Sequence, residues 1–261
     1  MTHEPAIVTE RRGDAFWIRI NRPERKNSYD ISMATTMADA LREASRSDAT
    51  AIVITGSGDS FCAGGFLGAL SDPDPIELRS LFHASLELFD LIRTAPQPVI
   101  AAVNGVAAGG GNELVVACDL AIAVESARFG QTGVRVGSAP VLGATNLLAL
   151  TIGEKRAKEV SFLCRTYSAR DVLQMGWIND VVSDDELDQA VASMVTELRA
   201  MSPRYLEIAK ISSNVWWNAC RDNYATSLGM LVQAIGSPDQ VEGAQAFMEK
   251  RPPEFPRRGQ R

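Results

Sequence analysis

In the first half of this chain, hydrophobic residues recur either with the alternation of a strand or with the spacing of a helix. The positions at which one pattern gives way to the other predict where the elements begin and end. AIVTERRGDAFWIRI (6–20) predicts two strands around a Gly-Asp turn, since AFWIRI alternates in character. Short apolar runs predict buried strands at 49–56, 98–105 and 120–126, and helical spacing predicts helices at about 31–46, 75–95 and 109–119. Strand, turn and helix thus recur at intervals of roughly 45 to 50 residues, which predicts stacked right-handed α/β units.

From about residue 143 the helical pattern dominates, and only WINDVV (177–182) has strand character. Helices are predicted at 144–153, 154–164, 168–176 and 185–201, and three more follow, separated near Pro203, Asn218 and Pro238. No low-complexity linker divides the chain. We therefore expect an α/β core over 1–200 and a helical C-terminal region over 201–261 that packs on this core or on a neighbouring subunit.

Composition narrows the class of protein. The 261 residues are 46% hydrophobic and 22% charged, with a net charge of −6 and no basic run beside stacked aromatics, so a nucleic-acid surface is not expected. The N-terminus has no apolar targeting segment and no long apolar span occurs, so we expect a cytoplasmic protein that does not enter membranes. Four cysteines without a C-x-x-C pair, and only two histidines, argue against disulfides and a metal site.

Three consecutive glycines, Gly109 to Gly111, stand at the junction of a predicted strand and helix, and Glu113 follows two residues later. A helix N-terminus presents unpaired N–H groups and the positive end of the helix dipole, and glycine lets a ligand approach the backbone. FCAGG (61–65) supplies a second small-residue turn after a strand. Two backbone donors converging on one oxygen would form an oxyanion hole, whereas tight helix–strand packing is the structural alternative.

With these motifs the chain resembles the crotonase superfamily, the enoyl-CoA hydratase/isomerase family, over nearly its whole length. The resembling segments, in the family's order and spacing, are NRPERKNS (21–28), FCAGG, PVIAAVNGVAAGGGNELVVACDLAIA (98–123), FGQTGVRVGS (129–138) and EGAQAFMEKRPPEF (242–255). The resemblance implies a spiral of ββα units, homotrimers or hexamers, and an acyl-CoA thioester substrate, with coenzyme A as part of the substrate and no separate cofactor. It also implies a thioester enolate held by two backbone N–H groups, which match Ala63 and Gly110.

The resemblance also suggests where the substrate lies. Arg25 and Lys26 match positions near the nucleotide of coenzyme A, and Phe247, Lys250 and Arg251 match positions where a neighbouring subunit often touches its phosphates. A solvated basic face is the alternative for each. The residues expected along the acyl group are Gly64, Gly65, Phe66, Leu67, Gly109, Gly133, Ser138, Pro140 and Val141.

Acid/base chemistry is where the chain departs from the family. Hydratases of this family typically use two glutamates, of which the first matches Glu113; the second normally follows FGQ by two residues, where this chain has Gly133. Without the second carboxylate, syn-hydration loses half of its acid/base groups. Glu113 can still act as a lone general base or orient a water, unless it only forms an ion pair at the helix start.

FGQTGVRVGS and FLCRTYSARDVLQMGWINDVV (162–182) are similar to the subgroup of dihydroxynaphthoyl-CoA synthase and 2-ketocyclohexanecarboxyl-CoA hydrolase. The chain departs there as well, with apolar residues where the pattern has polar ones: Ala139 to Gly143, Ala234, Ile235 and Phe66. An apolar pocket favours a hydrophobic or cyclic acyl group. His83, on the helix predicted at 75–95, is the remaining titratable candidate for catalysis, and its alternative is a histidine on a partly buried helix face.

The sequence therefore predicts an acyl-CoA-processing lyase of the hydratase type, with Glu113, Ala63, Gly110 and His83 as catalytic candidates. A hydrolase or C–C-bond lyase that opens a cyclic β-keto acyl-CoA is the first alternative. A thioester isomerase, which needs one base, and a catalytically silent CoA-binding member stay open.

Overall fold

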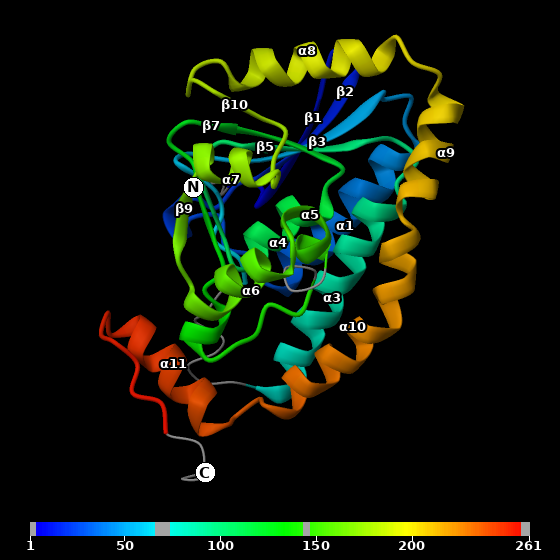
Figure 1. Cartoon of the computed structure of the whole chain (residues 1–261). Helices are drawn as coiled ribbons and strands as arrows, with labels where there is room; N and C mark the ends of the chain where they lie inside the picture. Colours follow the sequence, from blue (N-terminus) through cyan, green and yellow to red (C-terminus); the bar gives the residue numbers. More distant parts are fainter. Residues whose placement is uncertain (1–3, 66–73, 143–146, 257–261) are drawn as a thin grey trace.

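A computed structural model describes residues 4–65, 74–142 and 147–256. Its central feature is a six-stranded sheet in the order β1-β2-β3-β5-β7-β10 (Figure 1). β1 runs antiparallel to β2, and the remaining pairs are parallel. The strands are β1 (Ile7–Arg12), β2 (Ala15–Ile20), β3 (Ala51–Gly56), β5 (Val99–Val103), β7 (Leu120–Val124) and β10 (Asp180–Val182).

A second sheet of four short strands has the order β4-β6-β8-β9, of which only β9 is antiparallel. Its strands are β4 (Ser60–Cys62), β6 (Val106–Ala108), β8 (Arg128–Gly130) and β9 (Thr166–Ser168). Each of β3, β5 and β7 is followed along the chain by a strand of this second sheet, so each turn of the chain adds one strand to both sheets. This repetition confirms the predicted α/β spiral. The second sheet was not predicted, because three-residue strands are too short to show alternation.

Helices surround the two sheets, and local capping explains where they begin. Asp30 accepts a hydrogen bond from the Met33 N–H at 3.0 Å at the start of α1, and Asp74 accepts one from the Ile76 N–H at 2.8 Å at the start of α3. The helices of this part are α1 (Ile31–Arg46), α3 (Pro75–Thr94), α4 (Gly110–Ala117), α5 (Leu147–Ile152), α6 (Glu154–Leu163), α7 (Ala169–Met175) and α8 (Leu187–Arg199). Two short 3₁₀ helices are η1 (Pro23–Arg25) and η2 (Gly133–Val136).

Three further helices form the C-terminal region: α9 (Pro203–Ser213), α10 (Val215–Gln233) and α11 (Pro238–Met248). Figure 1 shows α9 and α10 passing along the outer side of the molecule and α11 lying at one end. α10 packs against α3, and α11 packs against η2. The break between α9 and α10 is at Asn214, not at the predicted Asn218, because the Asn214 side chain turns inward and donates to the Arg93 carbonyl at 2.6 Å. None of the helices in the described ranges has the length and apolar character to cross a membrane.

A buried ion pair joins this C-terminal region to the spiral. The Lys210 Nζ of α9 lies 2.7 Å from Asp119 Oδ2 and donates to the carbonyls of Ile92 and Gln97, each at 2.9 Å. Asp119 also accepts from the Val99 N–H at 2.8 Å. Burial holds the pKa of Lys210 below its usual value, although the charge of Asp119 opposes this shift. The ammonium is therefore tied by three acceptors to the edge of the core.

The first turn of α4 lies directly against β4. A Cβ added at Gly111 would lie 1.9 Å from the Cys62 carbonyl oxygen, and one at Gly64 would lie 2.7 Å from the Gly110 nitrogen. Only glycine fits at these contacts, because the clashing atoms belong to the backbone. The glycine run thus has a packing role as well as any chemical one, and it brings FCAGG onto the N-terminus of α4.

We expect Lys210→Met to lower the free energy of unfolding by up to about 3 kcal/mol, because the partly buried Asp119 would lose its cationic partner. Urea unfolding followed by circular dichroism measures this change. Lys158→Met is the matched control, since Lys158 pairs with Glu154 on an exposed helix face and its loss should change little. Equal effects of the two substitutions would contradict the role given to Lys210.

We expect Gly111→Ala to destabilise the protein by about 2–3 kcal/mol or more, because the new methyl group would overlap the Cys62 carbonyl. Gly229→Ala is the control: a Cβ there meets nothing within 4 Å. Since alanine favours helix, that substitution should stabilise α10 by about 0.5–1 kcal/mol. Thermal unfolding of both variants tests the pair, and a tolerated Gly111→Ala would show that β4 and α4 are not held as closely as described.

Candidate active site

A cavity of about 90 Å³ opens at the N-terminus of α4. The spiral supplies most of its wall, and the C-terminal region contributes Leu231 of α10. The wall is more apolar than polar, but it includes one carboxylate and several backbone groups. The described lining residues are Tyr29, Ala63, Gly65, Leu81, Phe82, Ser85, Gly109, Gly110, Glu113, Gln131, Thr132, Gly133, Val136, Ser138, Ala139, Pro140, Val141, Leu142 and Leu231.

Gly65 and Gly110 line this wall, and their backbone N–H groups have no partner among the described residues. Gly110 is the first residue of α4, so its N–H has no acceptor within the helix and lies at the positive end of the helix dipole. The sequence interpretation assigned the other donor to Ala63, and the structure corrects it. The Ala63 N–H donates to the Lys26 carbonyl at 2.9 Å, which leaves Gly65 as the donor of this turn.

Gly109 precedes α4 as its N-cap residue and sets the direction in which the helix begins. Its backbone has φ 54° and ψ −125°, a conformation that favours glycine. The Gly109 N–H donates to the Gly130 carbonyl at 3.0 Å, and the Gln131 side chain donates to the Gly109 carbonyl at 3.3 Å. The FGQ segment, which begins in β8 and ends at Gln131, thereby holds the glycine run in place, and the next N–H is that of Gly110 on the cavity wall.

Glu113 is the carboxylate of the described wall. It lies three residues after Gly110 on α4, so the two share a helix face. The side chain is buried, and the Leu142 N–H donates to Oε1 at 2.9 Å. A carboxylate held by a backbone donor beside unpaired N–H groups is positioned to accept a proton from a ligand.

Gly133, the first residue of η2, also lines the cavity, and a Cβ added there would make contacts of 3.4 Å with the backbone of 138–140. This position carries no second carboxylate, although a Cβ would make only van der Waals contacts there. Ser138 lies nearby and its N–H donates to the Gly133 carbonyl at 2.8 Å. Pro140 and Val141 extend the apolar part of the wall.

Tyr29 and Ser85 belong to the wall but were not singled out from the sequence. Tyr29 follows the polar loop NRPERKNS, yet it is 2% exposed. The signal that could have found it is an aromatic residue in an otherwise polar loop just before a capped helix.

His83 does not belong to the site, which corrects its proposed catalytic role. Leu81, Phe82 and Ser85 of α3 face the cavity, whereas His83 is exposed and is not part of the wall. Residues three or four positions apart lie on the same face of a helix, as Leu81, Phe82 and Ser85 do. His83 is two positions from both Leu81 and Ser85, so it points away from that face. The prediction placed the correct helix at the site but misjudged its rotation.

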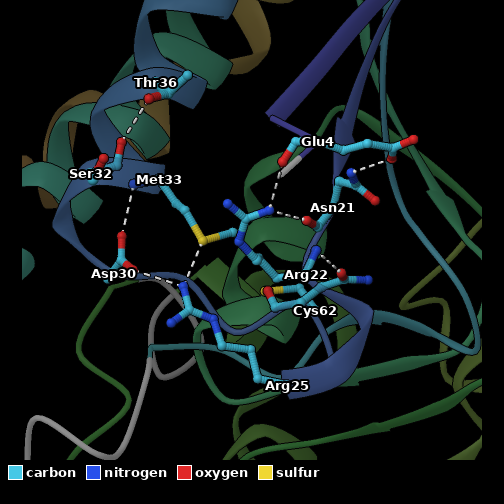
Figure 2. Close-up of polar contacts among 10 residues, drawn as sticks. Glu4, Asn21, Arg22, Arg25, Asp30, Ser32, Met33, Thr36 and Cys62 are labelled. Carbon is cyan, nitrogen blue, oxygen red and sulfur yellow. Dashed lines mark hydrogen bonds and ion pairs between the residues drawn. The ribbon is translucent and has the colours of Figure 1, made fainter. Parts of the chain in front are cut away.

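The residues expected to bind coenzyme A lie outside the cavity wall. The Arg25 guanidinium pairs with Asp30 at 2.7 Å and lies 2.9 Å from the Met33 sulfur (Figure 2). Lys26 is exposed, and its carbonyl accepts from Ala63 beside the FCAGG turn. Phe247 and Lys250 are exposed at the end of α11. Phe66 and Leu67 lie outside the described residues.

Comparison with known proteins agrees with this geometry. Residues 10–258 match the profile of the family described as Enoyl-CoA hydratase/isomerase. The chain is similar to carnitinyl-CoA hydratase from Mycobacterium avium, with 32% identity, a TM-score of 0.84, and coverage of 97% of this chain and 99% of that chain. It is also similar to an enoyl-CoA hydratase from Bacillus anthracis, with 28% identity, a TM-score of 0.79, and coverage of 96% and 99%.

A third similar structure is an enoyl-CoA hydratase from Mycobacterium avium subsp. paratuberculosis K-10, with 27% identity, a TM-score of 0.81, and coverage of 97% and 99%. These matches extend over the spiral and the C-terminal helices alike. The chain therefore belongs to the enoyl-CoA hydratase/isomerase family, the crotonase superfamily, whose members act on acyl-CoA thioesters.

Proposed function

We propose that this protein is a hydratase-type lyase that binds an acyl-CoA thioester and stabilises its enolate with the N–H groups of Gly65 and Gly110. The observation that carries the proposal is this pair of unpaired donors on one cavity wall, with the buried Glu113 on the same helix face as Gly110. Preorganised donors in a water-poor site stabilise developing negative charge without reorganising. The thioester oxygen would accept both hydrogen bonds, which places the α-carbon toward Glu113.

Glu113 is the proposed general base. Removal of a proton from the acyl chain, or from an attacking water, needs a carboxylate within hydrogen-bond reach of that proton. The Leu142 N–H holds one carboxylate oxygen in place. For addition of water to an enoyl group, Glu113 would orient and deprotonate the water, and the charge that develops would pass to the thioester oxygen between Gly65 and Gly110.

The second candidate is a hydrolase or C–C-bond lyase that opens a cyclic β-keto acyl-CoA. Gly133 and the apolar residues Pro140 and Val141 favour it, because these positions of the cavity wall offer apolar surface in place of a second acid. In that reaction water attacks the ring carbonyl, the C–C bond breaks, and its electron pair passes into the same thioester enolate. An isomerase needs only the single base and uses the same oxyanion hole.

We further propose that the nucleotide of coenzyme A lies near Lys26, whose main chain adjoins the FCAGG turn. Phe247 and Lys250 are proposed to contact the phosphates of coenzyme A bound by a neighbouring subunit. A homotrimer or hexamer is supported by large exposed apolar side chains on three helices, namely Phe162, Tyr205, Ile211 and Trp216. The C-terminal helices after residue 200 carry three of these four side chains.

Glu113→Gln should lower turnover of an acyl-CoA substrate by about 10²- to 10⁴-fold, because the amide cannot accept the proton. Binding of the substrate should be retained, since the N–H donors are unchanged. Mass spectrometry after incubation with crotonyl-CoA and with 2-ketocyclohexanecarboxyl-CoA shows which thioester gains water and whether a ring opens. Glu154→Gln, on an exposed face, is the control. An unmutated protein that converts no acyl-CoA of a wider panel would favour a catalytically silent CoA-binding protein.

Gly133→Glu should raise the rate of water addition to crotonyl-CoA relative to the unmutated protein, because it adds a second carboxylate to the cavity wall at a position where a Cβ meets only ordinary contacts. Gly133→Gln is the matched control, equal in size but without acid/base capacity. Steady-state loss of the enoyl thioester absorbance measures the rate. Equal rates for the two variants would mean that position 133 does not face the reacting carbons.

A further inference from the structure

Tyr29 extends along the cavity wall from one proposed oxyanion donor to the other. At its backbone end, the Tyr29 N–H donates to the Gly64 carbonyl at 2.9 Å, and Tyr29 forms an isolated parallel bridge with Gly65. At the other end, its hydroxyl oxygen would lie 2.6 Å from a Cβ placed on Gly110. One side chain thus spans the gap between the two glycines.

The hydroxyl lies on the side of Gly110 from which a ligand must approach. Cα–Cβ bonds in an α-helix tilt toward its N-terminus, and the N–H groups point the same way. An oxygen 2.6 Å from the Cβ position of Gly110 therefore lies near the N-terminal end of α4, on the side of this residue's N–H. This position is within the described cavity wall, and Tyr29 is part of that wall.

The hydrogen bonds around Tyr29 leave its hydroxyl proton available for a ligand. Among the described residues, Ser85 is the hydrogen-bond partner of the Tyr29 hydroxyl, at 3.3 Å between the oxygens. Ser85 is the donor of this bond, and its single proton is also within reach of the Leu81 carbonyl at 2.8 Å. When Ser85 donates to the Tyr29 oxygen, the tyrosine proton can be given to a ligand oxygen at the mouth of the oxyanion hole.

Tyr29 also stays neutral at the pH values at which enzymes work. Burial raises the pKa of its phenol far above the usual value, although the hydrogen bond from Ser85 opposes this shift, and the nearby carboxylate of Glu113 raises the pKa further. A phenol in this state is a hydrogen-bond donor rather than an acid that gives up its proton. It would strengthen a hydrogen bond as negative charge grows on the acceptor.

We propose that the Tyr29 hydroxyl is a third hydrogen-bond donor to the thioester enolate oxygen, in addition to the N–H groups of Gly65 and Gly110. This inference rests on the proposed function, because it assigns a further group to the same oxyanion hole. It also explains why this position has a hydroxyl group, since a phenylalanine would fill the same apolar space without one. The substrate class it favours is one whose reaction concentrates charge on the thioester oxygen.

The test uses acetoacetyl-CoA, a thioester whose enolate absorbs in the near ultraviolet. A hole that stabilises the enolate lowers the pH at which the bound thioester ionises, relative to the free thioester in solution. We expect Tyr29→Phe to raise the midpoint of the bound thioester by about one pH unit, which corresponds to a tenfold loss of enolate stabilisation. On a thioester that the protein turns over, kcat should fall by about 10- to 100-fold with little change in KM.

Tyr167→Phe is the matched control, because Tyr167 packs near Trp177 away from the cavity, and its midpoint should equal that of the unmutated protein. A fluorotyrosine at position 29 keeps the side chain's shape and is a stronger donor, so it should lower the midpoint even if Tyr29→Phe folds poorly. An unchanged midpoint in both Tyr29 variants overturns the inference and leaves the proposed function standing. If the unmutated protein does not lower the midpoint of acetoacetyl-CoA, the enolate-stabilising function fails, and the inference fails with it.

Discussion

The site depends on the close contact between the β4 turn and the first turn of α4. Gly64 and Gly111 permit this contact, because a Cβ at either position would overlap backbone atoms of the other segment. With the two turns so close, the N–H groups of Gly65 and Gly110 lie on one cavity wall although 45 residues separate them in sequence. Packing and chemistry are therefore not competing explanations of the glycine run: the packing creates the chemical arrangement.

Much of this arrangement follows from the sequence. Buried runs and helical spacing predicted β3, β5, β7, α1 and α3 to within a few residues, because long periodic segments carry a strong signal. The order of motifs predicted the spiral and the family. The Ala63 assignment was one residue-level error with a physical cause: small residues in a turn show that a backbone donor is near, but only the path of the chain shows which N–H is already bonded. Here the Ala63 N–H is already bonded to the Lys26 carbonyl.

Other features depend on contacts between residues that are distant in sequence, and only the structure shows these contacts. His83 lies on the correct helix but on its outer face, since the rotation of a helix is set by the neighbours on which it packs. Lys210 has no sequence signal for burial, because lysine is almost always exposed, and its partner Asp119 lies 91 positions away. The end of α9 was misplaced at Asn218 for a similar reason: the tertiary bond from Asn214 to Arg93 decides where the helix stops. Contacts between distant residues override local pattern in each case.

The cavity has more hydrogen-bond donors than acid/base groups. The N–H groups of Gly65 and Gly110 share the wall with one described carboxylate, and the position expected for a second carboxylate is Gly133. Glu113 can move a proton on one side of the substrate, whereas the wall at Pro140 and Val141 can only exclude water. A site with this balance is suited to reactions whose difficult step is formation of the enolate and whose proton transfers need a single base. The reaction class therefore depends on what the acyl group itself brings into the apolar half of the cavity: an enoyl carbon that takes up water, or a ring carbonyl whose C–C bond breaks into the same enolate.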